Sequence, residues 1–153
     1  MDSDPAREGY HLRPASAADA KAIRQIIHLV NINPTSLSWK RFIVAVDASR
    51  TIIGCGQVKP HRDGTLELAS LAVLPEWRGK GVARAIIEHL MEQNNGRLYL
   101  MCRSPLEPLY EKFGFQAIEY EDMPPYFQQI SRLAAMFGKL TKEVGHLSVM
   151  KRN

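Results

Sequence analysis

Two glycines and several basic side chains stand between an apolar run and an amphipathic stretch in the segment LAVLPEWRGKGVARAIIEHL, residues 71–90. Glycine lets a ligand approach the backbone closely, and the first amide groups of a helix point toward an anion that lies before it. Arg78, Lys80 and Arg84 add positive charge around Gly79 and Gly81. This pattern predicts a site for a phosphate or pyrophosphate group.

Two familiar phosphate-binding patterns do not fit this segment. The P-loop spacing G-x-x-x-x-G-K-[ST] is absent, and a G-x-G-x-x-G fingerprint would need glycine where Arg84 stands. The segment alone also leaves open a tight strand-to-helix turn that binds nothing.

The segment resembles the pyrophosphate loop of the GNAT superfamily of acetyl-CoA-dependent N-acetyltransferases, whose pattern is R/Q-x-x-G-x-G/A. Arg78-Gly79-Lys80-Gly81-Val82-Ala83 fits that pattern, with Ala83 in the last position. Farther along, PLYEKFGF (108–115) is similar to a second landmark of the family, a helix with a tyrosine followed by Gly-Phe. The resemblance covers roughly residues 10–120 and leans toward the amino-acid acetyltransferase branch, which is similar to N-acetylglutamate synthase.

The resemblance implies acetyl-CoA as the co-substrate and no metal. Backbone amides around the loop would hold the CoA pyrophosphate, and the strand before it would hold the pantetheine arm and the thioester carbonyl. The implied cofactor-binding residues are Leu71, Ala72, Val73, Arg78, Gly79, Lys80, Gly81, Val82, Ala83 and Arg84.

Two residues are the catalytic candidates. Tyr110 matches the general-acid tyrosine of the family and would protonate the departing thiolate; its helical spacing with Leu106 and Phe113 also fits a core aromatic residue. Glu67 lies in an otherwise apolar strand, where a carboxylate is costly unless it is paired or faces a cleft. We expect Glu67 to act as general base; an ion pair, or a water relay in its place, is the alternative.

Other reactive side chains are expected to be structural. Cys55 and Cys102 lie in apolar runs, which favours packed thiols over a covalent acetyl-cysteine route. The five histidines show no metal-ligand spacing. His61 is expected to be a solvated loop residue, with an assisting role on the substrate side as the alternative. Ser104 is expected to cap the tyrosine helix, with Glu107 completing a capping box.

Trp39 and Tyr126 are the candidate substrate-binding residues, because the family builds its acceptor wall from the first helices and late elements. We expect a primary amine of a small molecule, leaning to an amino acid or related polar amine, to attack acetyl-CoA directly in a ternary complex. The alternatives are a protein or peptide N-acetyltransferase and a non-catalytic acyl-CoA-binding module.

These residues must be positioned by strands and helices that the apolar pattern predicts in the order β-α-(α)-β-β-β-α-β-α-β-α-β. The fold class is therefore α/β (α+β), and the GNAT resemblance implies a mostly antiparallel mixed sheet of about seven strands, flanked by helices and splayed between its fourth and fifth strands. The expected strands are 10–15, 41–47, 51–60, 65–75, 97–102, 115–120 and 146–151, and the expected helices are 16–30, 81–93, 104–114 and 126–137, with a short one within 31–39.

The chain has 153 residues, which suits one domain; we expect a flexible tail at 1–9 and a single acetyltransferase domain at 10–153. The net charge of +4 is spread along the chain, so no nucleic-acid partner is expected. The polar start of the chain and the absence of a membrane-length apolar run predict a cytoplasmic protein with no membrane partner, as a monomer or homodimer.

Overall fold

A computed structural model describes residues 9–30, 37–137 and 145–153. Most of the expected N-terminal tail and of the expected short helix within 31–39 lies outside the described residues. The chain divides into two compact units: unit 1 comprises Met1–Lys59 and Leu68–Gln93, and unit 2 comprises Pro60–Glu67 and Asn94–Asn153.

Seven strands of the described residues form one mixed sheet in the order β1-β2-β3-β4-β5-β7-β6. The strands are β1 (Tyr10–Pro14), β2 (Phe42–Asp47), β3 (Ile52–Pro60), β4 (Leu66–Val73), β5 (Leu98–Arg103), β6 (Gln116–Ala117) and β7 (Leu147–Arg152). The α-helices are α1 (Ala20–Leu29), α2 (Val82–Gln93), α3 (Glu107–Glu111) and α4 (Pro125–Phe137), joined by short 3-10 turns. The predicted fold class and strand number are confirmed.

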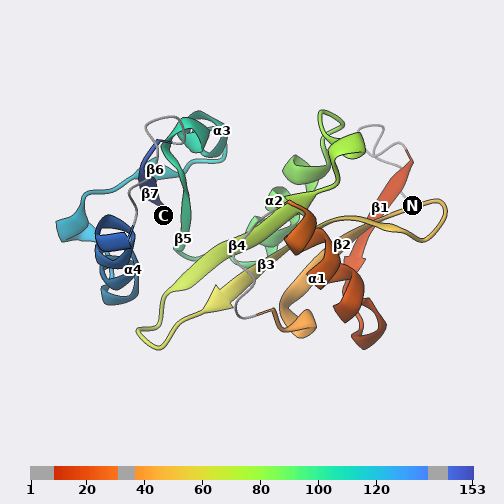
Figure 1. Cartoon of the computed structure of the whole chain (residues 1–153), viewed down its shortest axis with the longest axis horizontal. Helices are drawn as coiled ribbons and strands as arrows, with labels where there is room; N and C mark the ends of the chain where they lie inside the picture. The colour runs from red at the N-terminus through yellow and green to blue at the C-terminus, as the bar shows by residue number, and fades with distance from the viewer. Residues whose placement is uncertain (1–8, 31–36, 138–144) are drawn as a thin grey trace. The chain divides into compact units, whose positions relative to one another are not determined.

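In unit 1, β1, β2 and β3 pair antiparallel, and α1 and α2 cover opposite faces of the strands (Figure 1). Because side chains alternate across a strand, Cys55 packs with Ile23 and Ile27 of α1 while its two glycine neighbours face α2. The alternation of side chains along β3 therefore allows α1 to pack on one face of the strand and α2 on the other.

Gly54 and Gly56 allow α2 to lie close to β3. A Cβ atom added at Gly54 would stand 2.9 Å from Val82 Cγ1, and one added at Gly56 would stand 2.8 Å from Ile86 Cγ2. The close backbone neighbour predicted from these glycines is thus helix α2, the same helix that begins at the glycine-rich loop.

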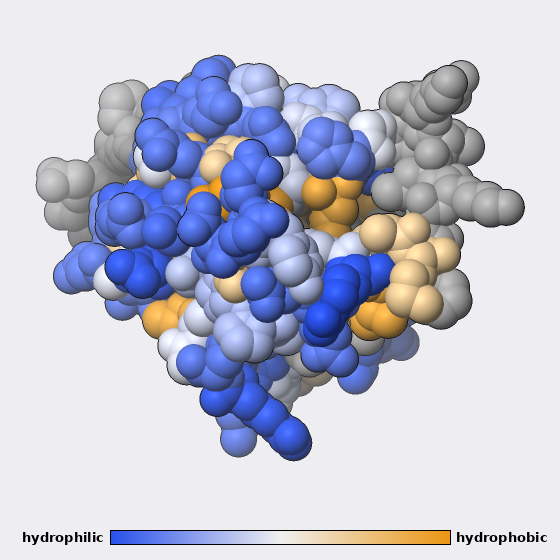
Figure 2. All heavy atoms as spheres, turned by 90° about the vertical axis from the view of Figure 1, so that its left-hand side faces the viewer, coloured by the Kyte–Doolittle hydropathy of each residue, from blue (hydrophilic) through white to orange (hydrophobic). Residues whose placement is uncertain are grey.

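In unit 2, β7 pairs antiparallel with both β5 and β6, and Glu67 of β4 pairs parallel with Tyr99 of β5. Tyr99, Phe127 of α4 and Val149 of β7 form a buried cluster. Figure 2 shows a face that is mainly hydrophilic, with hydrophobic side chains in small separate areas.

One detail of the sequence-based expectations is wrong. Ser104 does not cap the tyrosine helix: its hydroxyl accepts a bond from the His146 amide at 3.2 Å, and Glu107 accepts one from Ser148 at 2.5 Å. Both side chains are therefore used to hold the adjoining strand β7. In α2 the buried face begins at Val82 and includes Ala85, whereas Ala83 is only half-buried.

Helix α4 packs through Phe127, which is fully buried, whereas 43% of Leu133 is exposed. Phe127 reaches Tyr99 of β5, with ring centroids 5.2 Å apart, so this packing decides which face of the helix is buried.

Candidate active site

The loop from Arg78 to Gly81 has the backbone conformation that the anion-site prediction requires. Gly79 and Gly81 have φ angles of +77° and +80°, a region that side chains other than glycine rarely adopt. A Cβ atom at Gly79 would meet nothing within 4 Å, so the loop surface there is open to a ligand. The 12-residue helix α2 follows immediately and adds the partial positive charge of its N-terminus. A pyrophosphate group fits this surface.

Aromatic residues anchor the loop from behind. The Tyr10 hydroxyl donates to the Gly81 carbonyl at 3.3 Å, and the Tyr10 and Trp77 rings meet edge to face with centroids 6.0 Å apart. The Lys80 ammonium lies 4.8 Å from the centroid of the Trp77 ring. Sequence reasoning missed Tyr10, because no local pattern connects the first strand to a loop about seventy residues later.

The cationic side chains of the loop remain near its surface. Arg78, Lys80 and Arg84 are exposed, and Arg84 pairs with Glu88 one helical turn later at 3.2 Å. Ion pairs between exposed side chains are weak in water, so these cations remain available to an anionic ligand.

Strand β4 bends just before the three residues that are expected to hold the pantetheine arm, Leu71, Ala72 and Val73. Ser70 has a φ of +56°, which is unusual for a residue with a side chain and interrupts a regular strand. Its hydroxyl accepts a bond from the buried Gln57 at 2.8 Å, and Gln57 in turn accepts one from Arg41 at 3.1 Å. This buried network, which the sequence did not indicate, holds the bend in place.

Tyr110 lies on α3 in unit 2 and is half-buried. Its ring packs edge to face against Phe115, with centroids 6.4 Å apart. Burial, with a smaller contribution from the charge of Cys102, raises the pKa of Tyr110 to about 12. The hydroxyl is therefore protonated at neutral pH and can donate a hydrogen bond or a proton.

Glu67 is buried and paired. Its Oε1 lies 2.8 Å from His61 Nε2, and only 5% of its side chain and 11% of the His61 side chain are exposed. The expectation of a solvated His61 is wrong: the ring stacks on Tyr126, with centroids 3.6 Å apart and planes 17° apart. The sequence spacing could have predicted this pair. The turn HRDG places residue 61 opposite residue 65, so Glu67 lies diagonally across the hairpin from His61.

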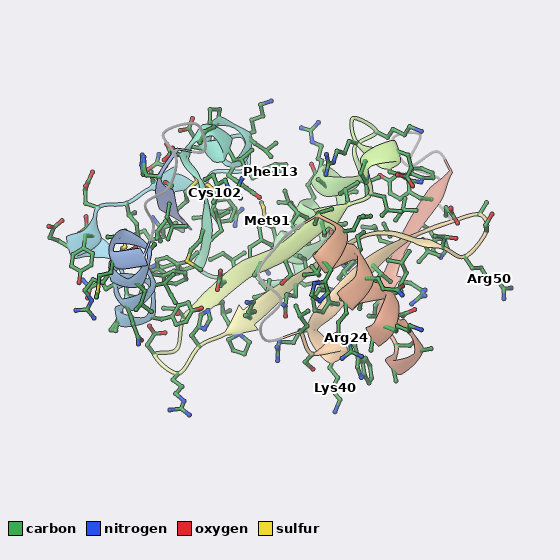
Figure 3. The ribbon with its side chains drawn as sticks, in the orientation of Figure 1. Arg24, Lys40, Arg50, Met91, Cys102 and Phe113 are labelled. Atoms are coloured by element: carbon green, nitrogen blue, oxygen red, sulfur yellow. The ribbon has the colours of Figure 1, made fainter. Side chains whose placement is uncertain are left out.

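The two expected substrate-binding aromatics have different surroundings. Trp39 packs at the edge of the α1 core in unit 1, and Lys40, which Figure 3 shows extending away from the ribbon, lies 5.9 Å from the Trp39 ring centroid. Tyr126 is half-buried in unit 2 against His61. Burial, and then the charge of Glu67, raises the pKa of Tyr126 above its ordinary value.

Both cysteines are buried, as expected from their apolar surroundings. Burial raises the pKa of Cys55 to about 12 and that of Cys102 to about 11, which keeps both thiols protonated and poorly nucleophilic. Cys102 lies on β5 (Figure 3), with its sulfur 3.8 Å from Met150 Sδ. Among the described residues, no three His, Cys, Asp or Glu side chains gather as a metal site.

Comparison with known proteins identifies the class that this fold and loop define. The family description "Acetyltransferase (GNAT) domain" matches residues 38–117, about half of the chain. The chain belongs to this family, as the paired sequence landmarks indicated.

Sequence relatives include larger and smaller proteins. Human cysteine-rich protein 2-binding protein is 34% identical over 88 residues, a match that covers 55% of this chain and 11% of that protein; the mouse protein is 33% identical. The matched segment thus spans about a ninth of the length of those relatives. An uncharacterized N-acetyltransferase of Chlorobaculum tepidum is 27% identical over 125 residues, covering 74% of this chain and 79% of that protein.

Solved structures share the fold at low identity. N-acetylglutamate synthase from Neisseria gonorrhoeae, in complex with CoA and N-acetyl-glutamate, has a TM-score of 0.73 and 17% identity, covering 94% of this chain and 34% of that one. A Mycobacterium tuberculosis protein in complex with CoA gives 0.71 and 21%, covering 93% and 98%. A chain of the NatC complex bound to Gag peptide and CoA gives 0.66 and 18%, covering 94% and 98%.

None of the helices in the described part of the chain has the length and apolarity that a bilayer crossing requires.

Proposed function

We propose that this chain transfers the acetyl group of acetyl-CoA to the primary amine of a small polar molecule, with an amino acid as the favoured acceptor. The proposal rests on the loop at residues 78–81, where two left-handed glycines and an open surface precede helix α2. Family membership and the CoA present in related structures support it.

The proposed reaction uses backbone groups of the glycine-rich loop and of the strand that precedes it. Backbone amides from Arg78 to Ala83, with Lys80 and Arg84, bind the pyrophosphate. Amide and carbonyl groups of Leu71, Ala72 and Val73 hold the pantetheine arm and the thioester carbonyl, and an amide aimed at that carbonyl stabilises the negative oxygen that forms on attack.

The remaining residues transfer protons or contact the acceptor. Tyr110 donates a proton to the departing thiolate, and its raised pKa keeps it in the donor form. The buried Glu67 carboxylate takes part in the base function that the attacking amine requires. Tyr126 and Trp39 contribute to the acceptor surface.

A peptide acceptor is the second candidate, because the NatC chain, solved with a bound peptide, has a similar fold. A non-catalytic CoA-binding module is the third, since it would need only the loop. The three candidates differ in turnover: the first two consume acetyl-CoA, and the third binds CoA without consuming it.

The test is an acetyl-CoA consumption screen over amino acids, polyamines, aminoglycosides and short peptides, with CoA binding measured by calorimetry. Each amino acid is matched to its own C-terminal amide and to a dipeptide that begins with it. We expect turnover with a free amino acid and a much higher KM for its amide. Preferred turnover of peptides would favour the second candidate, and CoA binding without any turnover the third.

A further inference from the structure

His61 is held in one orientation by contacts from two elements of unit 2, β4 and α4. Its Nε2 lies 2.8 Å from Glu67 of β4, and its ring is stacked on Tyr126 of α4. The Phe127 ring approaches it edge-on, with centroids 5.8 Å apart. A hairpin turn can form without any of these contacts to its histidine. The contacts therefore point to a function that needs the His61 ring in one orientation.

Asp63 fixes the turn that presents this ring. Its carboxylate accepts bonds from the Thr65 amide at 3.0 Å and from the Tyr126 amide at 3.2 Å, which joins the hairpin to the start of α4. Burial pushes the pKa of Asp63 upward, but these bonds and the nearby charge of His61 outweigh it, and the pKa lies below its ordinary value. Asp63 therefore stays ionised and holds His61 under Tyr126.

The pair has a defined direction for proton transfer. A carboxylate only accepts hydrogen bonds, so contact with Glu67 places the imidazole proton on Nε2 and leaves the lone pair on Nδ1. Within the described residues Nδ1 makes no hydrogen bond, and it is not among the buried atoms that lack a partner. Since the Glu67 side chain is 5% exposed and that of His61 is 11% exposed, the imidazole is the member of the pair with more access to solvent.

Four groups face the His61 ring. Two are carboxylates: Glu67, which lies 2.8 Å from Nε2, and Asp63, whose lowered pKa keeps it ionised. The Tyr126 hydroxyl, whose pKa is raised, stays neutral, and Phe127 is apolar. An imidazole that receives a proton here is immediately compensated by the carboxylate at 2.8 Å.

We infer that His61 is the catalytic base of the acetyl transfer and that Glu67 is a positioning residue that acts through it. This inference rests on the proposed function. The proton of the acceptor ammonium moves to His61 Nδ1, directly or through one water. The freed lone pair forms the carbon–nitrogen bond at the thioester carbonyl, the carbon–sulfur bond breaks, and the thiolate takes the proton that Tyr110 donates. The second proton that the nitrogen loses on becoming an amide passes through water to the Tyr110 oxygen and restores its hydroxyl. His61 then carries one extra proton beside the Glu67 carboxylate and releases it to solvent.

The test compares His61→Gln with Glu67→Gln in the pH dependence of kcat/KM from pH 5 to 9. Glutamine at 61 can still donate to Glu67 but cannot accept a proton. We expect it to lower kcat by about 100-fold or more, to leave the affinity for acetyl-CoA unchanged, and to abolish the rise of rate with pH. Glu67→Gln should lower the plateau but keep the rise, because the imidazole is still present.

His28→Gln is the matched control, since His28 is exposed on α1, and it should retain wild-type kinetics. If His61→Gln keeps the rise and Glu67→Gln loses it, then Glu67 is the base and the inference is wrong. Turnover of His61→Gln within threefold of the wild type also overturns it. If the wild type consumes no acetyl-CoA with any amine, the proposed function itself fails, which is a different outcome from an active wild type with an unaffected His61→Gln.

A measurement on the unaltered protein guards against a variant that does not fold. Two-bond proton–nitrogen NMR spectra of the wild type should show the neutral His61 ring protonated on Nε2. A neutral ring protonated on Nδ1 could not accept a proton at that atom and would overturn the inference.

Discussion

Tyr110 illustrates how the surroundings of one side chain decide its chemistry. Its sequence position fitted both a proton donor and a core aromatic. The structure gives it a half-buried position on α3, beside Phe115, with a pKa raised to about 12. A hydroxyl in this state is a poor base but a stable donor, which is the role proposed for it.

Tyr110→Phe should lower kcat by about 10- to 100-fold and leave acetyl-CoA affinity near that of the wild type, because the ring remains and only the proton donor is lost. Steady-state kinetics and calorimetry measure the two effects. Tyr120→Phe is the control: 37% of Tyr120 is exposed, and we expect no change. Unaltered turnover in Tyr110→Phe would leave Tyr110 with a packing role alone.

At the scale of elements, the junction between β4 and α2 combines a strand bend, an anchored turn and a helix start. Ser70 bends β4, Tyr10 and Trp77 support the turn, and Gly54 and Gly56 admit α2 against β3. The loop conformation is therefore maintained by neighbours on several strands.

Gly79→Asp tests the anion-binding role of this loop. Aspartate tolerates a positive φ better than most residues, so its main effect at Gly79 is a negative charge where the pyrophosphate is expected. We expect a loss of CoA affinity of at least 10-fold by calorimetry. The control is Gly64→Asp, because Gly64 has a φ of +87° and equally open surroundings.

Gly64→Asp should cost similar backbone strain and keep CoA affinity. Equal affinity in wild type and Gly79→Asp would contradict the assignment of the loop.

At the scale of the whole molecule, the Arg13–Asp19 pair makes the stability of the chain depend on pH in the acid range. The pair connects β1 to the turn before α1. Arg13 donates to both Asp19 oxygens, at 2.7 and 3.0 Å, and Asp19 also accepts from the Ser16 amide. The hydrogen bond from Arg13, opposed by burial and helped by Ser16, lowers the pKa of Asp19 from 3.8 to about 2.

Because this pKa is lowered on folding, the stabilisation is complete above the unfolded value and disappears as the pH falls from about 4 to about 2. Asp19→Asn should therefore reduce the free energy of unfolding at pH 7 by on the order of 1–2 kcal/mol and be nearly neutral near pH 2. Urea unfolding at both pH values measures this. Asp122→Asn, at an exposed position, should show no such pH-dependent difference.

Local patterns predicted the strands, the four α-helices and the glycine-rich loop, since each depends on neighbouring residues. They failed where a side chain bonds a distant strand. Ser104 and Glu107 have the spacing of a capping box but bond to the start of β7, and His61 has the sequence context of a solvated loop but is stacked beneath α4. The splay between the fourth and fifth strands and the single-domain boundary stay predictions.

The sequence by itself determined the order of elements, the glycine loop and the family, because hydrophobic period, turn residues and motif spacing are all local properties of the chain. Only the tertiary structure decided which polar groups meet: Tyr10 with Gly81, Gln57 with Ser70, and His61 with Glu67. Those pairings depend on strand register and on which helix face packs inward. Such pairings set the proton-transfer chemistry of a side chain. The role of Glu67 could therefore be inferred only from the structure, which places His61 against it.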